Sequence, residues 1–135
     1  MAYKIDEIEG IGPSFREKLR AVGVKTTDDL LSRCANAAGR RSFSEVCGIG
    51  EKQLLGWTNM ADLMRVSGVG RQYAELLEAA GVDTVKELRN RNAENLTVAM
   101  KKVNGEKNLA KTSPSGTTVR RWIDQAKRTD PVISY

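Results

Sequence analysis

Residues 66–89 read VSGVGRQYAELLEAAGVDTVKELR, and they resemble an earlier stretch of the same chain. That stretch, residues 8–31, reads IEGIGPSFREKLRAVGVKTTDDLL, and an offset of 58 residues aligns the two without a gap. The identical positions are mostly glycines, apolar residues and one helix-capping threonine, which are the residue types that fix backbone geometry. The match therefore predicts an internal duplication that preserves a fold.

Each copy is predicted to hold a tight turn followed by two helices. Two glycines around one apolar residue, as in Gly10-Ile11-Gly12, suit a turn with positive φ. Pro13 suits the first position of a helix, and Gly23 is a natural residue to end it. Residues 26–29 read TTDD and resemble a capping box that opens the next helix, and residues 84–87 take these places in the second copy.

Four such turns are expected along the chain. We define the first, second and third glycine turns as residues 10–12, 48–50 and 68–70, and the fourth turn, which has lost its first glycine, as residues 112–116. The helices after the second and fourth turns align with an offset of 65, which is the offset that aligns Trp57 with Trp122. The change from 58 to 65 implies an insertion of about seven residues, and we expect it near residues 101–111.

The pattern apolar-x-Gly-apolar-Gly before a helix resembles the helix-hairpin-helix motif, two of which form a tandem domain in many DNA repair and recombination proteins. The whole chain further resembles a bacterial family of tandem helix-hairpin-helix proteins known only as a domain of unknown function. The similar stretches are WTNMADLMRVSGVG, LLEAAGVDTVKELRNRNAENL and WIDQAKRTDPVISY. This resemblance implies an all-α, internally duplicated tandem helix-hairpin-helix fold, a SAM-like bundle of two packed helical subdomains. We place them at residues 1–65 and 66–135, with an extended C-terminal tail at 129–135.

Composition disfavours several classes of function. The chain has no histidine, which is the commonest general base and metal ligand, and its two cysteines, Cys34 and Cys47, match no zinc spacing. No apolar run is long enough to cross a membrane, and neither type of glycine-rich nucleotide loop is complete. We therefore expect no enzyme, no cofactor, no metal and no small-molecule substrate. Free buried thiols fit a bacterial cytoplasm, and Trp57 and Trp122 are expected in the core rather than stacked on bases.

Positive charge is concentrated near the C-terminus. The net charge is +5, yet residues 1–99 hold 14 basic and 14 acidic side chains, whereas residues 100–135 hold 8 basic and 3 acidic ones. Lysines on or near the expected insertion suit a flexible basic segment that attracts phosphates without reading sequence.

The third glycine turn is the best candidate for contact with double-stranded DNA. In DNA-binding relatives, the amides of such a turn and of the following helix bind a backbone phosphate, as the helix dipole favours. Acidic neighbours disfavour the first turn, whereas the second, followed by Glu51 and Lys52, is ambiguous. The predicted DNA-contacting residues are Ser67, Gly68, Val69, Gly70, Arg71 and Gln72 at the third turn, Gly48, Gly50 and Lys52 at the second, and the basic residues Lys101, Lys102, Lys111, Arg120 and Arg121.

A helical protein-interaction module is the alternative. The balanced charge of the first half favours it, because apolar helix faces also dock partner helices. The tail provides a second argument, since residues 131–135 follow the last helix and start with a proline. We expect the tail either to pack across its own chain or to dock on another protein.

Overall fold

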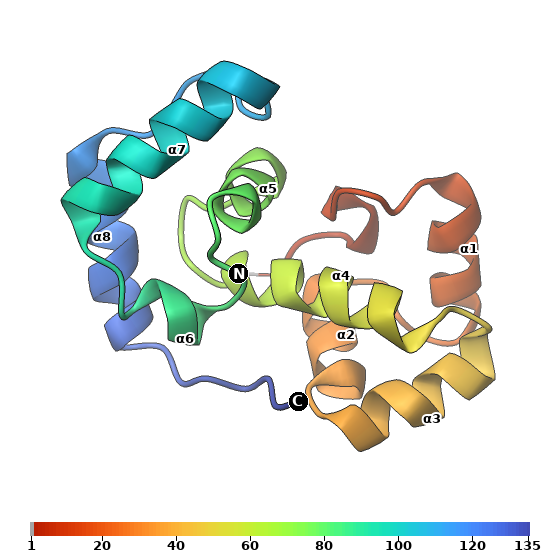
Figure 1. The fold of residues 1–135 in the computed structure, drawn as a ribbon. Helices are drawn as coiled ribbons and strands as arrows, with labels where there is room; N and C mark the ends of the chain where they lie inside the picture. Colours follow the sequence, from red (N-terminus) through yellow and green to blue (C-terminus); the bar gives the residue numbers. More distant parts are fainter. Residues whose placement is uncertain (1) are drawn as a thin grey trace.

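The computed structural model describes residues 2–135, and within them the chain is helical, with one β-bridge between Lys4 and Thr26 and no strand. The prediction of an all-α fold is confirmed. In chain order the elements are the 3-10 helix η1 (Ile5–Glu7) and the α-helices α1 (Pro13–Ala21), α2 (Thr27–Cys34), α3 (Ala37–Cys47), α4 (Glu51–Leu63), α5 (Arg71–Ala79), α6 (Val85–Leu88), α7 (Ala93–Lys107) and α8 (Gly116–Lys127) (Figure 1).

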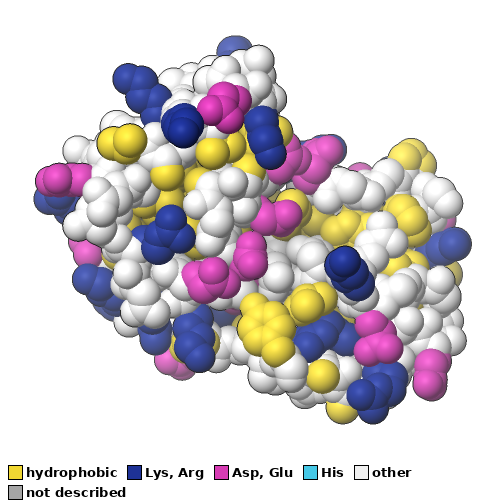
Figure 2. All heavy atoms as spheres, in the orientation of Figure 1, with side chains coloured by type: hydrophobic (Ala, Val, Ile, Leu, Met, Phe, Trp, Pro, Cys, Tyr) yellow, Lys and Arg dark blue, Asp and Glu magenta, His cyan; other side chains and the backbone are white. Residues whose placement is uncertain are grey.

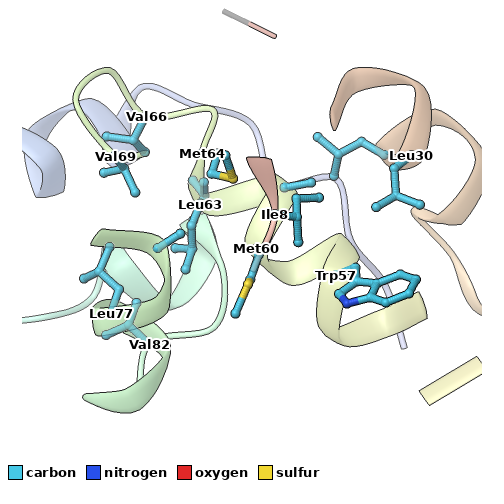
Figure 3. Packing of buried hydrophobic residues seen from close by; sticks show 14 of the residues in the cluster. Ile8, Leu30, Trp57, Met60, Leu63, Met64, Val66, Val69, Leu77 and Val82 are labelled. Atoms are coloured by element: carbon cyan, nitrogen blue, oxygen red, sulfur yellow. The ribbon is translucent and has the colours of Figure 1, made fainter. Parts of the chain in front are cut away.

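Helix α4 joins the two halves of the molecule. It contacts α2 and α3 in the first half and α5 in the second, where α7 and α6 pack on α8 and α5 packs on α7. Figure 3 shows the core continuing along α4, from Ile8 and Trp57 through Leu63 to Val69 and Leu77. Each such buried side chain stabilises the fold by about 1.5–3 kcal/mol. The halves therefore share one hydrophobic core.

The first and third glycine turns have closely similar backbones. Gly10 and Gly68 have φ of +96° and +89°, in the region that disfavours residues with a side chain. A Cβ on either glycine would lie 3.3 Å from an indole nitrogen, that of Trp57 beside Gly10 and that of Trp122 beside Gly68. Both tryptophans are buried, as expected. Each tryptophan also packs against an aromatic ring of the helix that follows the turn, Phe15 of α1 for Trp57 and Tyr73 of α5 for Trp122, with ring centroids 5.0 Å and 5.2 Å apart.

The predicted helix ends are largely confirmed. Pro13 is the first residue of α1, and Gly23, with φ of +90°, follows its last turn. A capping box opens α2, because Thr26 and Asp29 each accept a backbone N–H of the other. At the start of α6 only half of that arrangement forms, since Thr84 accepts from the Glu87 N–H without a reciprocal bond among the described residues.

Two sequence expectations about element boundaries are wrong. Residues 59–62 read NMAD, and an asparagine before an apolar run predicts a capped helix start at this point. These residues instead continue α4, and the Asp62 carboxylate accepts from the Val85 N–H at the start of α6, at 2.8 Å. The expected flexible segment is also mostly helical, because α7 extends to Lys107 and only residues 108–115 form a loop. Helix α7 has 15 residues and α3 has 11, so much of the added length prolongs a helix.

The C-terminal tail returns to the first half (Figure 1). The Ser134 N–H donates to the Ala35 carbonyl at 2.8 Å, and the Ser134 carbonyl accepts from the Arg40 guanidinium at 2.7 Å. Arg40 is only 5% exposed and also donates to the carbonyls of Cys34 and Ala35. Arg65 adds a bond to the Asp130 carbonyl at 2.9 Å. Of the two expectations for the tail, packing across its own chain is the one observed.

Both cysteines are free thiols, but they differ in burial. Cys34 is fully buried, and this burial raises the pKa of its thiol to about 11. Cys47 is half-buried and packs against the core, so it is less buried than expected. None of the helices in residues 2–135 has the length and apolar character needed to span a membrane.

Candidate nucleic-acid interface

Helices that follow a glycine turn begin without a side-chain cap. In residues 2–135, three α-helices lack such a cap, and their N-cap residues are Gly12, Gly50 and Gly70. The side-chain oxygens that cap the other five belong to Thr26, Asn36, Thr84, Asn92 and Ser115. The first amides of α4 and α5 are therefore left for water or a ligand, as are those that follow Pro13 in α1, since proline itself has no N–H. The fourth turn differs, because Ser115 accepts from the Thr118 N–H.

The predicted free amides of the third turn are only partly free. The Ser67 N–H donates to Gln125 on α8 at 3.1 Å, and the Val69 N–H donates to the Val66 carbonyl at 3.0 Å. The Val69 side chain is fully buried, so it anchors the turn instead of facing a ligand. The N–H groups of Gly68 and Gly70 donate to no described residue, and the first amides of α5 are open as well. These are the groups that the helix dipole makes attractive to an anion.

Arg71, expected as a free cation, is paired with the first half. Its Nε donates to a Glu9 carboxylate oxygen at 2.6 Å, although 62 residues separate the two, and both side chains are nearly half exposed. This hydrogen bond, with the neighbouring charges of Glu9, Glu7 and Glu75, raises the pKa of Arg71. Burial and the Glu9 charge in turn raise the pKa of Glu75. The guanidinium is therefore accessible but already has an anionic partner.

Two hollows lie on either side of the third turn. The first, which we call the α5 hollow, has a volume of about 430 Å³ and is lined by Glu7, Gly70, Arg71, Gln72, Tyr73, Lys111 and Thr112. The second, which we call the α8 hollow, has a volume of about 320 Å³ and is lined by Ser67, Gly68, Tyr73, Thr118, Arg121, Trp122 and Gln125. The structure therefore places predicted residues of the third turn beside Lys111 and Arg121.

The loop after α7 is fixed against the third turn. Asn104 is buried, and its side-chain oxygen accepts from the Ala110 N–H at 2.8 Å. The next residue, Lys111, donates its N–H to the Gln72 side chain at 3.2 Å, and Tyr73 donates its hydroxyl to the Thr112 carbonyl. Lys111 is thus held at the mouth of the α5 hollow.

The other predicted residues do not line these hollows. Lys101 and Lys102 lie exposed on α7, and Arg120 is exposed on α8 but diverges from Arg121, as expected for adjacent helical residues. Gly48, Gly50 and Lys52 belong to the second turn, between α3 and α4. Figure 2 shows basic side chains scattered among acidic ones on the face in view, without one continuous basic patch.

Sequence reasoning missed six of the residues that line the two hollows: Glu7, Tyr73, Thr112, Thr118, Trp122 and Gln125. Thr118 and Gln125 share a face of α8 with Arg121, so helical spacing from Arg121 would have identified them. Trp122 was assigned to the core, which is correct, yet it also borders the α8 hollow, as does the half-buried Tyr73. No group of three or more histidine, cysteine or acidic side chains in residues 2–135 is placed to hold a metal ion.

Comparison with known proteins identifies a family. The family model described as Domain of unknown function (DUF4332) matches residues 9–129. Neither a curated protein nor a solved structure matches the chain.

Proposed function

Because this chain belongs to the DUF4332 family, whose description assigns no activity, we propose its function from the third-turn interface: non-enzymatic, sequence-independent binding of double-stranded DNA through phosphates. We further propose that the fold is a duplicated tandem helix-hairpin-helix bundle, which the similar backbones of the first and third turns support. We assign the protein to a bacterial cytoplasm, which its two free thiols support.

One observation carries this proposal: α5 begins with uncapped amides at a place where basic side chains converge. Lys111 and Arg71 line the α5 hollow beside these amides, and Arg121 lines the hollow on the other side of the turn. An oxyanion gains hydrogen bonds from open amides and favourable charge from both the helix dipole and the cations. All these contacts are to phosphate, so they carry no information about base sequence.

Arg71 already has an anionic partner in the free protein. Its Nε contacts Glu9, and Glu7 also lines the α5 hollow. A guanidinium has five N–H donors, so a phosphate that enters competes with the Glu9 carboxylate and can replace it as the acceptor. The exchange is feasible because the pair is nearly half exposed, and exposed ion pairs contribute only about 0–1 kcal/mol.

Fluorescence anisotropy of a labelled duplex, titrated with the protein at several salt concentrations, tests the proposal. The logarithm of the binding constant should fall with the logarithm of salt, by about 0.9 for each phosphate neutralised. Lys111→Glu should weaken binding strongly, whereas Lys86→Glu, the same change on α6 away from both hollows, should weaken it far less. Binding that salt leaves unchanged, or no binding at low salt, would refute the proposal.

The alternative function is a helical protein-interaction module without DNA binding. The observation in its favour is the acidic environment of Arg71, where Glu7, Glu9 and Glu75 all act on one guanidinium. The tail no longer favours this alternative, because its Ser134 backbone bonds to the first half of its own chain. Failure of the duplex to bind at any salt concentration would make this the preferred function.

A further inference from the structure

The α8 hollow lies between the third glycine turn and α8, and its size allows a ligand larger than water. Its volume is about 320 Å³, whereas one liquid water occupies about 30 Å³. Gln125 holds one wall in place, because its side chain accepts from the Ser67 N–H and donates to the Ser67 hydroxyl. The hollow is therefore a fixed feature of the second half.

Trp122, which lines this hollow, has an unpaired donor. Trp122 is 2% exposed, yet its indole N–H has no hydrogen-bond acceptor among residues 2–135. The nitrogen lies 3.3 Å from where a Gly68 Cβ would be, and both residues line the hollow. It is not among the side-chain atoms sealed from solvent. Because an indole N–H can only donate, it needs an acceptor from outside the chain.

The charge of the α8 hollow favours an anionic acceptor. Arg121 lines it and makes no hydrogen bond or ion pair with any described residue, and Thr118 adds a hydroxyl. None of the lining residues within 2–135 is acidic. The α5 hollow differs, because Glu7 lines it and its arginine, Arg71, is already paired with Glu9. An oxyanion therefore meets less competition in the α8 hollow.

The first half contains a natural control for this site. Trp57 also presents an unpaired indole nitrogen 3.3 Å from the Cβ position of its turn glycine, Gly10. The 65-residue offset puts Gly56 where α8 has Arg121, and the 58-residue offset puts Glu9 where the third turn has Ser67. The first half thus has the same indole donor without the cation and with a carboxylate nearby.

We propose that the α8 hollow is a phosphate subsite, in which the Trp122 indole N–H, the Arg121 guanidinium and the Thr118 hydroxyl bind one phosphate group. Where that phosphate belongs to a nucleic-acid strand, the inference rests on the proposed function and adds a second contact across the third turn. Free inorganic phosphate has the same oxygens and fits the same donors.

The indole N–H signals of Trp57 and Trp122 in a two-dimensional ¹H–¹⁵N NMR spectrum test the subsite, with Trp57→Phe assigning both. On titration with inorganic phosphate, the Trp122 signal should shift and the Trp57 signal should not. Arg121→Gln should weaken the apparent affinity about ten-fold, the loss expected for a charged hydrogen bond. Arg120→Gln, which removes the same charge from the neighbouring position, should leave it nearly unchanged. The subsite would be overturned if the Trp57 and Trp122 signals both shifted or both stayed in place. It would also be overturned if Arg121→Gln and Arg120→Gln changed the apparent phosphate affinity equally.

A second titration with short duplex DNA separates this inference from the proposed function. A Trp122 shift with both duplex and phosphate supports a strand contact at the subsite. A shift with phosphate, together with no duplex binding by anisotropy, keeps the subsite and rejects the proposed function. Duplex binding that leaves the Trp122 signal in place rejects the strand contact while the proposed function stands.

Discussion

The two glycines of the third turn have different structural roles. Gly68 has φ of +89° and lies against Trp122, whereas Gly70 has φ of −96° and open space where a Cβ would be. Gly68→Ala should therefore lower the free energy of unfolding by about 1–2 kcal/mol, because an L-residue is strained at positive φ. Gly70→Ala should cost far less. Urea denaturation of both variants measures the difference, and equal losses would contradict this account.

The Glu9–Arg71 pair makes a second prediction at the scale of single residues. If Glu9 competes with phosphate for Arg71, Glu9→Gln should strengthen duplex binding several-fold, by removing an ion pair worth about 0–1 kcal/mol and a repelling charge. Glu45→Gln makes the same charge change on an exposed site of α3 and is the control. Anisotropy at low salt compares the two. If Glu9→Gln bound the duplex more weakly than the unchanged protein, the phosphate would bind at a site other than Arg71.

At the scale of an element, the start of α2 couples its capping to pH. The Asp29 carboxylate accepts from the Lys25 and Thr26 N–H groups, and these bonds lower its pKa. Because the pKa of Asp29 is lower in the folded than in the unfolded protein, its ionised carboxylate stabilises the fold at any pH above the unfolded-state pKa. This stabilisation is lost as the pH falls through the folded-state pKa. Asp29→Ala should therefore reduce stability by about 1 kcal/mol at pH 7. Thermal denaturation from pH 7 to pH 3 should show this deficit shrinking, and a constant deficit would refute the coupling.

Elements with local signals were predictable from sequence, and contacts between distant elements were not. The capping box of Thr26 and Asp29 spans three residues, so the chemistry of both ends is visible in one short stretch. The Glu9–Arg71 pair spans 62 residues and depends on how the halves pack, which no local pattern encodes. Residues 101–107 were mistaken for a flexible segment because added length was assumed to be loop, although α7 absorbs much of it.

At the scale of the whole molecule, the tail holds the two halves together. Removing residues 131–135 takes away both Ser134 backbone bonds and leaves the buried Arg40 with two of its three carbonyl acceptors. The truncated chain should be less stable by about 1–3 kcal/mol, the cost of a buried polar group that loses its partner. Urea denaturation measures this, with Ser134→Ala as the control because that side chain makes neither bond. Unchanged stability, with a change in oligomeric state by gel filtration, would show that the tail serves another chain.

The tail contacts also have a consequence for how this family can diverge. Asp130 and Ser134 bond to the first half only through their backbone atoms, which every residue type carries, with proline alone lacking the N–H. Substitution at positions 130 and 134 should therefore cost little stability, whereas Ile133 packs its side chain against the core. A single insertion or deletion between residues 130 and 134 shifts the Ser134 position away from Arg40 and Ala35. At these two positions the spacing of the chain should matter more than the type of residue.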